Sequence, residues 1–267
     1  MQNEERFVWY AINSVIDALD KILVWDLGST DRTVEIISTI KSDKLVFEKR
    51  EPVGVEEFPR VRQEMLAETK SDWFLILDGD EVWWEESIGQ VVETVQSQGD
   101  KLAGIVNPNF SLVGDMFHYQ SEEGARYEIQ GRKGHFNMRA VNRRTAGLHA
   151  AGRHGQQGYF DGQGMAVQDL PSLKWVEAPY LHLTHLARSE SREKDAEVAK
   201  RKGKFKYELG EEFPRDFYFP EVFFRLDRLE IVPTPWERRS WSFAMKSRLI
   251  EPARWLKRQV MRGKSGY

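Results

Sequence analysis

The stretch that decides the fold is Asp72-Trp73-Phe74-Leu75-Ile76-Leu77-Asp78-Gly79-Asp80-Glu81. Its four apolar residues, 74–77, predict a short strand that is buried on both faces. Two aspartates separated by one glycine follow directly, and residues i and i+2 of an extended chain point the same way. Two neighbouring carboxylates are unfavourable unless a cation lies between them. Asp78 and Asp80 therefore predict a site for Mg²⁺ or Mn²⁺, and a solvated acidic turn is the alternative.

The composition is that of a globular chain of 267 residues, with 40% hydrophobic residues, 30% charged residues and a net charge of -3. These values argue against disorder and give no overall attraction to nucleic acid. The sequence contains no cysteine, which excludes disulfides, thiol catalysis and cysteine-bound zinc. No stretch reaches the roughly 18 apolar residues of a membrane span and no signal peptide opens the chain, so we expect a cytoplasmic protein.

A second acidic turn follows an earlier apolar stretch. Residues 21–25 predict a strand, and Asp26-Leu27-Gly28-Ser29-Thr30-Asp31-Arg32-Thr33 supplies a tight turn and capping residues for the helix after it. A further strand is predicted at 45–47 and a helix at 58–69. This alternation is typical of an open, mostly parallel α/β sheet flanked by helices, which binds ligands beyond the carboxyl ends of its strands. Both acidic turns fall at that edge, so we expect them to converge.

Three motifs in this order resemble those of the family 2 glycosyltransferases, which have the GT-A fold: Asn3-Glu4-Glu5, the turn at 26–33, and Leu77-Asp78-Gly79-Asp80-Glu81. The resemblance covers residues 3–90 well and weakens beyond them. It implies transfer of a sugar from a nucleotide-diphosphate donor to an acceptor hydroxyl, with inversion, and with Mg²⁺ or Mn²⁺ between the diphosphate and the Asp-x-Asp turn. It also implies a glycan, a lipid-linked molecule or another hydroxyl compound as acceptor, in cell-surface glycan or polysaccharide synthesis.

The same resemblance implies roles for the acidic turns. Asp26 would contact the nucleotide base, with Ser29 and Asp31 beside it in the same turn. Asp78 would bind the ribose or the metal ion. Asp80 would be the main ligand of the metal.

Two further contacts with the donor are implied. An arginine at the place of Arg62 often faces the nucleotide in this family, and a solvated helix charge is the alternative. Residues 180–185 alternate like a strand, which places His182 and His185 on opposite faces, so both cannot bind one ion. The resemblance favours His182 as a ligand of the metal or diphosphate, and a satisfied core histidine is the alternative.

The catalytic base is not decided by the sequence. Direct attack on the sugar needs a carboxylate or histidine near the acceptor hydroxyl. We take His149 as the tentative base and Asp161 as its alternative, ahead of His154 and Asp169.

We expect residues 1–188 to form a GT-A-like domain, with a nucleotide-sugar half at 1–100 and an acceptor half at 101–188. Residues 189–267 are expected to form a helical, basic C-terminal extension. Its last thirty residues contain nine lysines and arginines against Glu251 alone. A basic amphipathic helix there can lie on the anionic inner face of a membrane, and packing on its own domain is the alternative.

Two other functions stay open. The family has a β-strand immediately before the Asn3 motif, where this sequence has only Met1 and Gln2. Either the sheet lacks that strand or the chain begins upstream, so a non-catalytic GT-A domain that binds a nucleotide sugar, a glycan or a partner is the first alternative. The second is a haloacid dehalogenase-type phosphatase, whose motif Asp78-Gly79-Asp80-Glu81-Val82 satisfies. That family places the motif on its first strand, whereas two βα units precede it here.

Overall fold

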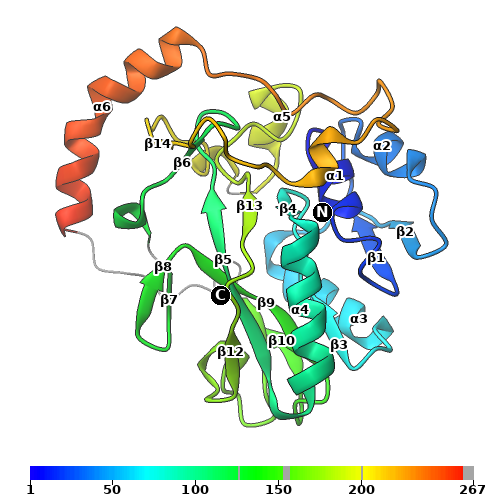
Figure 1. Ribbon diagram of the computed structural model, residues 1–267. Helices are drawn as coiled ribbons and strands as arrows, with labels where there is room; N and C mark the ends of the chain where they lie inside the picture. Colours follow the sequence, from blue (N-terminus) through cyan, green and yellow to red (C-terminus); the bar gives the residue numbers. More distant parts are fainter. Residues whose placement is uncertain (126, 153–156, 200, 261–267) are drawn as a thin grey trace.

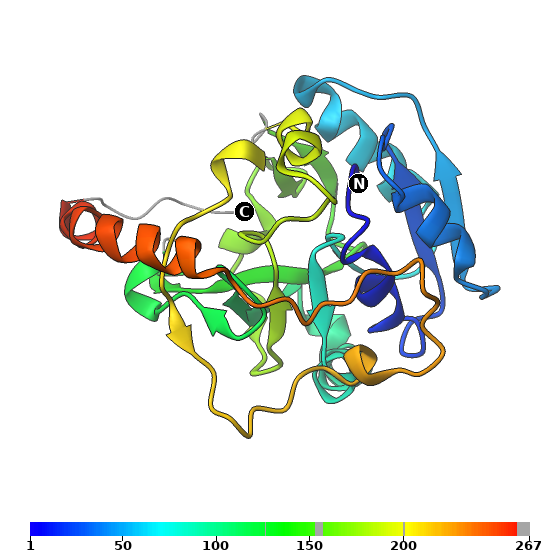
Figure 2. The same cartoon turned by 90° about the horizontal axis from the view of Figure 1, so that it is seen from above.

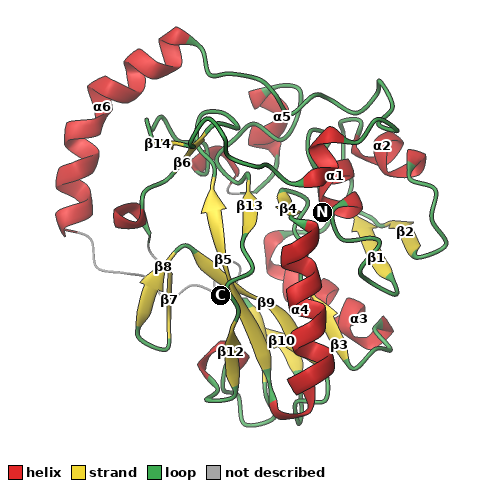
Figure 3. Cartoon of the chain, viewed as in Figure 1, coloured by secondary structure: helices red, strands yellow, loops and turns green. Residues whose placement is uncertain are grey.

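The computed structural model describes residues 1–125, 127–152, 157–199 and 201–260. A curled six-stranded sheet lies at its centre, with α4 across it (Figures 1 and 3). The α-helices are α1 (Val8–Asn13), α2 (Thr33–Thr39), α3 (Phe58–Glu68), α4 (Glu85–Gln98), α5 (Arg192–Glu197) and α6 (Trp241–Val260). The strands are β1 (Ile22–Asp26), β2 (Leu45–Lys49), β3 (Trp73–Leu75), β4 (Glu81–Trp83), β5 (Gly104–Ser111), β6 (His118–Tyr119), β7 (Tyr127–Ile129), β8 (Arg132–Gly134), β9 (Phe136–Asn142), β10 (His149–Ala151), β11 (Gly158–Phe160), β12 (Leu173–Trp175), β13 (Tyr180–His182) and β14 (Glu211–Glu212). Short 3₁₀ helices are η1 (Val55–Glu57), η2 (Gly99–Lys101), η3 (Glu122–Gly124), η4 (Val167–Asp169), η5 (Arg201–Gly203) and η6 (Glu221–Phe224).

The central sheet has the strand order β3-β9-β5-β13-β4, with β12 paired to β5. β5 runs parallel to β13 and β12, whereas β9 is antiparallel to both β3 and β5, and β4 is antiparallel to β13. The predicted α/β fold with flanking helices is confirmed. The sheet itself is mixed rather than mostly parallel, because β9 returns between β3 and β5 in the opposite direction.

The first two strands form a separate parallel pair, β1 with β2, in the register Ile22↔Leu45 to Asp26↔Lys49. Among the described strands, β1 pairs with β2 alone. On its other side, the backbone N–H of Leu27 donates to the carbonyl of Met1 at 2.8 Å, and the amino group of Met1 donates to the carbonyl of Trp25 at 2.7 Å. The first residue therefore lies beside the end of β1, next to the acidic turn at 26–33.

The strand that precedes the Asp-x-Asp turn is shorter and less buried than the sequence predicts. β3 ends at Leu75, and all three of its residues are only half-buried, because β3 is the edge strand of the sheet. The buried strand is the next one, β4, whose three residues are buried. The ring of Trp83 stacks on that of Tyr180 in β13, with centroids 4.7 Å apart. The acidic turn is thus fixed mainly by the strand that follows it.

The C-terminal part of the chain returns over the N-terminal half (Figure 2). Helix α5 is short and ends at Glu197, and both Asp195 and Arg201 are buried. Arg201 donates to the carbonyls of Gln2 and Asn3 and pairs with Glu4, so contacts cross the boundary expected at 188/189. Further on, an aromatic cluster joins Phe213 and Phe217, with ring centroids 3.9 Å apart, to Phe110 in β5. Helix α6 then extends at one side of the molecule (Figures 1 and 2).

Candidate active site

Asp80 occupies a buried position between β3 and β4, with 1% of its surface exposed. Its carbonyl accepts a hydrogen bond from the backbone N–H of Leu183 at 2.8 Å, which ties the turn to the end of β13. Its Oδ2 lies 2.8 Å from Nη2 of Arg188 and 3.5 Å from Nε2 of His182. Burial alone would raise the pKa of Asp80, but the charge of Arg188 outweighs it and the pKa is lowered. The carboxylate is therefore ionised and has a cation beside it.

The histidine that ends β13, His182, and the one that follows the strand, His185, have different surroundings, as their alternation predicts. Burial, with the charges of Arg139 and Lys204, lowers the pKa of His182 to about 3 despite Asp80 nearby. His182 is therefore neutral near pH 7, with a ring nitrogen facing Asp80. His185 points away from this turn: its Nε2 is 2.9 Å from the side-chain oxygen of Gln120. Of the two, only His182 faces the acidic turn.

Asp78 has a cation of its own. Arg139, buried on β9, forms an ion pair with Glu81 and has its Nη2 3.5 Å from Oδ2 of Asp78. Its Nε donates to the hydroxyl of Tyr180 at 3.1 Å. Burial would raise the pKa of Asp78, but Arg139 and Arg62 outweigh it, so its pKa is lowered, whereas burial raises the pKa of Glu81 well above its usual range. The side chain of Asp78 is 38% exposed, so this carboxylate lies at the mouth of the site.

The carboxylate of Asp26 is held by its own turn. Oδ2 accepts hydrogen bonds from the backbone N–H groups of Gly28, at 3.2 Å, and Ser29, at 3.0 Å, and Oδ1 accepts one from the Ser29 hydroxyl. Gly28 has a φ of 81°, in the left-handed region, and a Cβ there would lie 2.4 Å from Cγ of Pro52. The turn therefore requires glycine at this position, and Asp26 with Ser29 fixes its shape.

Asp31 connects the second acidic turn to the first. Its Oδ1 accepts from the backbone N–H of Thr33 at 2.9 Å, at the start of α2. Its Oδ2 accepts from the hydroxyl of Ser189 at 2.9 Å. Ser189 follows Arg188, the residue beside Asp80, so consecutive residues contact the two turns. The predicted convergence of the acidic turns is confirmed, and residues 188–189 join them.

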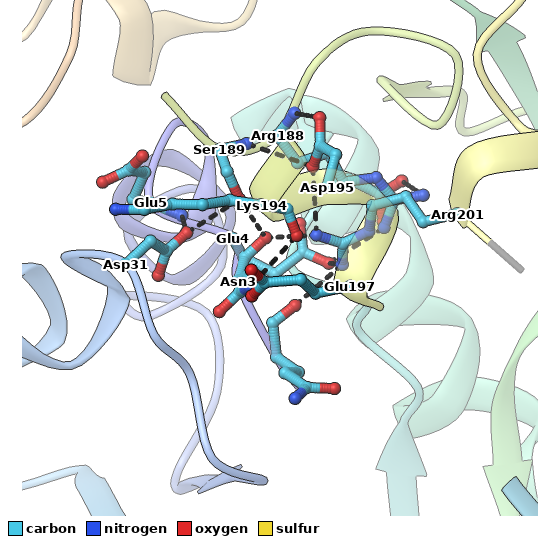
Figure 4. A network of polar contacts seen from close by, with 12 residues as sticks. Asn3, Glu4, Glu5, Asp31, Arg188, Ser189, Lys194, Asp195, Glu197 and Arg201 are labelled. Carbon is cyan, nitrogen blue, oxygen red and sulfur yellow. Dashed lines mark hydrogen bonds and ion pairs between the residues drawn. The ribbon is translucent and has the colours of Figure 1, made fainter. Parts of the chain in front are cut away.

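The Asn-Glu-Glu segment lies at the centre of a buried network (Figure 4). Oε1 of Glu4 accepts from Nη1 of Arg188 at 2.9 Å and from Nη2 of Arg201 at 2.5 Å. Burial raises the pKa of Glu4, although the two arginines oppose that shift. Its side chain packs directly against the Asp-x-Asp turn, because a Cβ on Gly79 would lie 2.8 Å from Cγ of Glu4. Glu4 belongs to a motif to which the sequence assigns no role, and the sequence reveals neither Arg188 beside Asp80 nor Arg201 beside Glu4.

The candidate bases lie away from these contacts. His149, half-buried on β10, has its Nδ1 2.9 Å from the carbonyl of Gly147. The next backbone N–H, that of Ala150, donates to the side chain of Gln63 on α3 at 2.7 Å, adjacent to Arg62. Oδ1 of Asp161 accepts from the backbone N–H groups of residues 163 and 165, both at 2.9 Å, and so stabilises a turn.

The other two candidate bases are Asp169 and His154. Asp169 is exposed at the end of η4. His154 lies outside the described residues.

Residues 1–156 match the family model described as Glycosyl transferase family 2. The chain belongs to this family. It is therefore classed with the glycosyltransferases, and the dehalogenase-type phosphatase is set aside. The family assignment agrees with the ordered acidic turns and with the α/β fold on which they lie.

Two relatives found by sequence are also glycosyltransferases. Over 95 residues, the chain is 28% identical to the SPbeta prophage-derived glycosyltransferase SunS of Bacillus subtilis and to glycosyltransferase SunS of Bacillus phage SPbeta. That alignment covers 35% of this chain and 22% of each relative. S. aureus TarS 1-349 superimposes with a TM-score of 0.45 and 13% identity, over 76% of this chain and 69% of that one. Glucosyl-3-phosphoglycerate synthase from Mycobacterium tuberculosis, in complex with Mn²⁺, uridine diphosphate and glucosyl-3-phosphoglycerate, superimposes with a TM-score of 0.45 and 17% identity. The superposition covers 68% of this chain and 69% of that one.

Proposed function

We propose that this glycosyltransferase moves a sugar from a nucleotide-diphosphate donor to an acceptor hydroxyl, with Asp80 and His182 holding Mg²⁺ or Mn²⁺ at the donor diphosphate. The facing pair of side chains carries this proposal. Nε2 and Oδ2 are 3.5 Å apart, longer than an ordinary hydrogen bond. The separation is close to the roughly 3 Å between adjacent ligands of an octahedral ion with bonds of about 2.1 Å.

The donor set fits a hard ion that shares its coordination with a substrate. Among the residues that the structure describes, no three carboxylates or imidazoles gather as a complete metal site. Asp80 and His182 would supply two ligands, and diphosphate oxygens and water would supply the others, as Mg²⁺ prefers. An ion bound there acts as a Lewis acid on the departing diphosphate. Asp78 would bind the ribose or the same ion, and its lowered pKa and partial exposure support this role.

We assign the nucleotide to the space between the two acidic turns. Asp26 and Ser29 shape one side of it, and Asp31 fixes that side to residue 189. Arg62 is near enough to Asp78 to lower its pKa, and so brings positive charge to the opposite side. Among these groups it is the charge of Arg62 that favours an anionic ligand in this space.

The reaction we propose is a single displacement. The acceptor oxygen forms a bond to the anomeric carbon while the bond from that carbon to the diphosphate breaks, which inverts the configuration. The acceptor proton passes to a base, for which His149 is our candidate and Asp161 its alternative. Replacing His149 by alanine should then lower the rate of transfer and leave donor binding unchanged.

Calorimetric titration of UDP and GDP, with and without Mn²⁺, tests the donor site. We expect nucleotide binding that requires Mn²⁺ and is lost in Asp80→Ala. Asp115→Asn is the matched control, because Asp115 is similarly buried but is paired with His118. Binding that persists without Mn²⁺ or without Asp80 would contradict the proposal. Metal-dependent binding without transfer to any acceptor would favour the non-catalytic alternative.

We also propose that α6 brings the enzyme to the anionic inner face of a membrane, where a lipid-linked acceptor would be found. The structure describes no helix that is long and apolar enough to span a bilayer. The inner face of α6 buries Phe243 and Ser247, whereas Trp241 and Leu249, two turns apart on its outer side, are 78% and 77% exposed. Arg248 lies beside them and is exposed. Exposed apolar side chains with adjacent basic ones favour an anionic lipid surface.

Co-sedimentation with vesicles tests this surface. We expect binding to vesicles that contain phosphatidylserine, weaker binding to pure phosphatidylcholine, and loss of binding in the double variant Trp241→Ala/Leu249→Ala. Leu229→Ala is the control, because Leu229 is 52% exposed but lies outside the helix. Equal binding of the double variant and the control would contradict a role for α6. The basic residues Arg262 and Lys264 lie outside the described residues.

A further inference from the structure

We propose that Arg188 is an internal counter-cation of the acidic turn: it competes with the metal ion for Asp80, and Glu4 retains it when the ion binds. This inference rests on the proposed function, because it concerns the same carboxylate. It makes Arg188 and Glu4 positioning residues that set the metal affinity of the site.

Arg188 lies between two buried carboxylates from distant parts of the chain. Nη2 is 2.8 Å from Oδ2 of Asp80, and Nη1 donates to Oε1 of Glu4 at 2.9 Å. Nη2 also donates to the hydroxyl of Thr184 at 3.0 Å. Only 7% of the arginine side chain is exposed. One guanidinium thus neutralises part of the charge on both carboxylates, with little help from water.

The oxygen that Arg188 contacts is the oxygen that the ion would need. Oδ2 of Asp80 faces both Nη2 of Arg188 and Nε2 of His182. A divalent ion bound to that oxygen would lie close to the positive guanidinium, and screening is weak at a buried site. Among the described residues, Oδ2 has no hydrogen bond of good geometry, so its contact with Arg188 is a charge contact. Such a contact can be exchanged for another cation without breaking an aligned hydrogen bond.

Glu4 would still bind the guanidinium of Arg188 after that group has moved away from Asp80. The backbone of Arg188 is fixed on both sides, since its carbonyl accepts from the N–H of Arg6 at 2.9 Å and its N–H donates to Asp195 at 3.1 Å. Only the end of the side chain has to move. Glu4 is itself fixed by Arg201 (Figure 4). In the described part of the chain Arg201 makes no ion pair with Asp80, so the contact with Glu4 can be tested apart from the contact with Asp80.

The test is Mn²⁺ binding without nucleotide, measured by calorimetry or by electron paramagnetic resonance. Arg188→Gln removes the competing charge, so we expect its Kd for Mn²⁺ to fall by about tenfold. Arg201→Gln is the matched control, with an equally buried arginine on the same glutamate, and its Kd should stay within about twofold of the wild type. Glu4→Gln leaves Arg188 with Asp80 as its remaining carboxylate partner, so its Kd should rise.

The Kd for Mn²⁺ should fall in Arg188→Gln and rise in Glu4→Gln. Damage to the fold would weaken binding in both variants, so these opposite changes distinguish competition from such damage. Melting curves add a second measurement: Mn²⁺ should raise the melting temperature of Arg188→Gln by more than that of the wild type. Equal or weaker Mn²⁺ binding by a folded Arg188→Gln would overturn the inference and leave the proposed metal site intact. Mn²⁺ binding that survives in Asp80→Asn would instead overturn the metal site, and the inference with it.

Discussion

The imidazole of His182 faces the carboxylate of Asp80, with Nε2 3.5 Å from Oδ2. The two residues meet because β13 and β4 are antiparallel and pair His182 with Glu81, the residue after Asp80. A shift of one residue in this register would bring Leu181 or Leu183 to the same place, since successive side chains of a strand point to opposite faces. The stacked rings of β4 and β13 oppose such a shift. The register of two short strands therefore determines whether His182 faces Asp80.

The two histidines at the end of β13 should have separable roles. We expect His182→Ala to weaken Mn²⁺-dependent nucleotide binding by about 10- to 100-fold, because a ligand of the ion is lost. His185→Gln should leave that binding unchanged, since His185 contacts Gln120 and the carbonyl of Lys204. Titration of UDP with Mn²⁺ into both variants is the measurement. A loss in His185→Gln that equals the loss in His182→Ala would argue against a metal ligand at 182.

The fold and the acidic half of the site are predictable because their signals are local. An apolar run predicts β3, Ser29 and Asp31 predict the start of α2, and periodic apolar residues predict α3. The spacing of Asp78 and Asp80 predicts that each needs a cation. The sequence does not predict the partner strand of β3, because strand order depends on packing between distant segments.

Apart from Arg62, the cations beside the acidic turn are not predictable from the sequence. Arg188 and Glu4 are 184 residues apart, and no local pattern relates them. Arg201 follows a charged stretch that has the composition of a solvent-facing helix, yet it is buried. Arg139 lies on β9, and only the antiparallel pairing of β9 with β3 brings it to Asp78. These contacts arise from tertiary structure alone.

Glycine is required at position 79 by close packing and not by backbone conformation. A Cβ there would lie 2.8 Å from Cγ of Glu4, whose carboxylate is held by two arginines, so Gly79→Ala should destabilise the protein by about 1–3 kcal/mol. Gly89→Ala in α4 is the control, because nothing lies within 4 Å of its Cβ. It should stabilise the protein by about 0.5–1 kcal/mol through helix propensity. Urea denaturation measures both, and equal effects would contradict the packing at residue 79.

Arg139 should be among the arginines that contribute most to stability. Arg139→Leu leaves Glu81 buried without its cation, and such a change costs about 3–5 kcal/mol. Arg144→Leu is the comparison: Arg144 pairs with Asp100, whose side chain is 85% exposed, and its loss should change stability by no more than about 0.5 kcal/mol. Chemical denaturation at neutral pH distinguishes the two. A small effect of Arg139→Leu would mean that Glu81 is protonated and needs no partner.

Lowering the pH should weaken the hydrogen bond by which Asp115 holds the segment before α6. Burial would raise the pKa of Asp115, but hydrogen bonds from His118, 2.6 Å away, and from the backbone N–H groups of Arg239 and Phe117 outweigh it, so the pKa is lowered. A lowered pKa in the folded state contributes stability above the unfolded pKa of about 3.9 and loses it as the pH falls through the folded value. Asp115→Asn should therefore be less stable than the wild type at pH 6, and the difference should shrink below about pH 4. Melting temperatures of both proteins across this range test the sign, and a difference that grows toward low pH would contradict it.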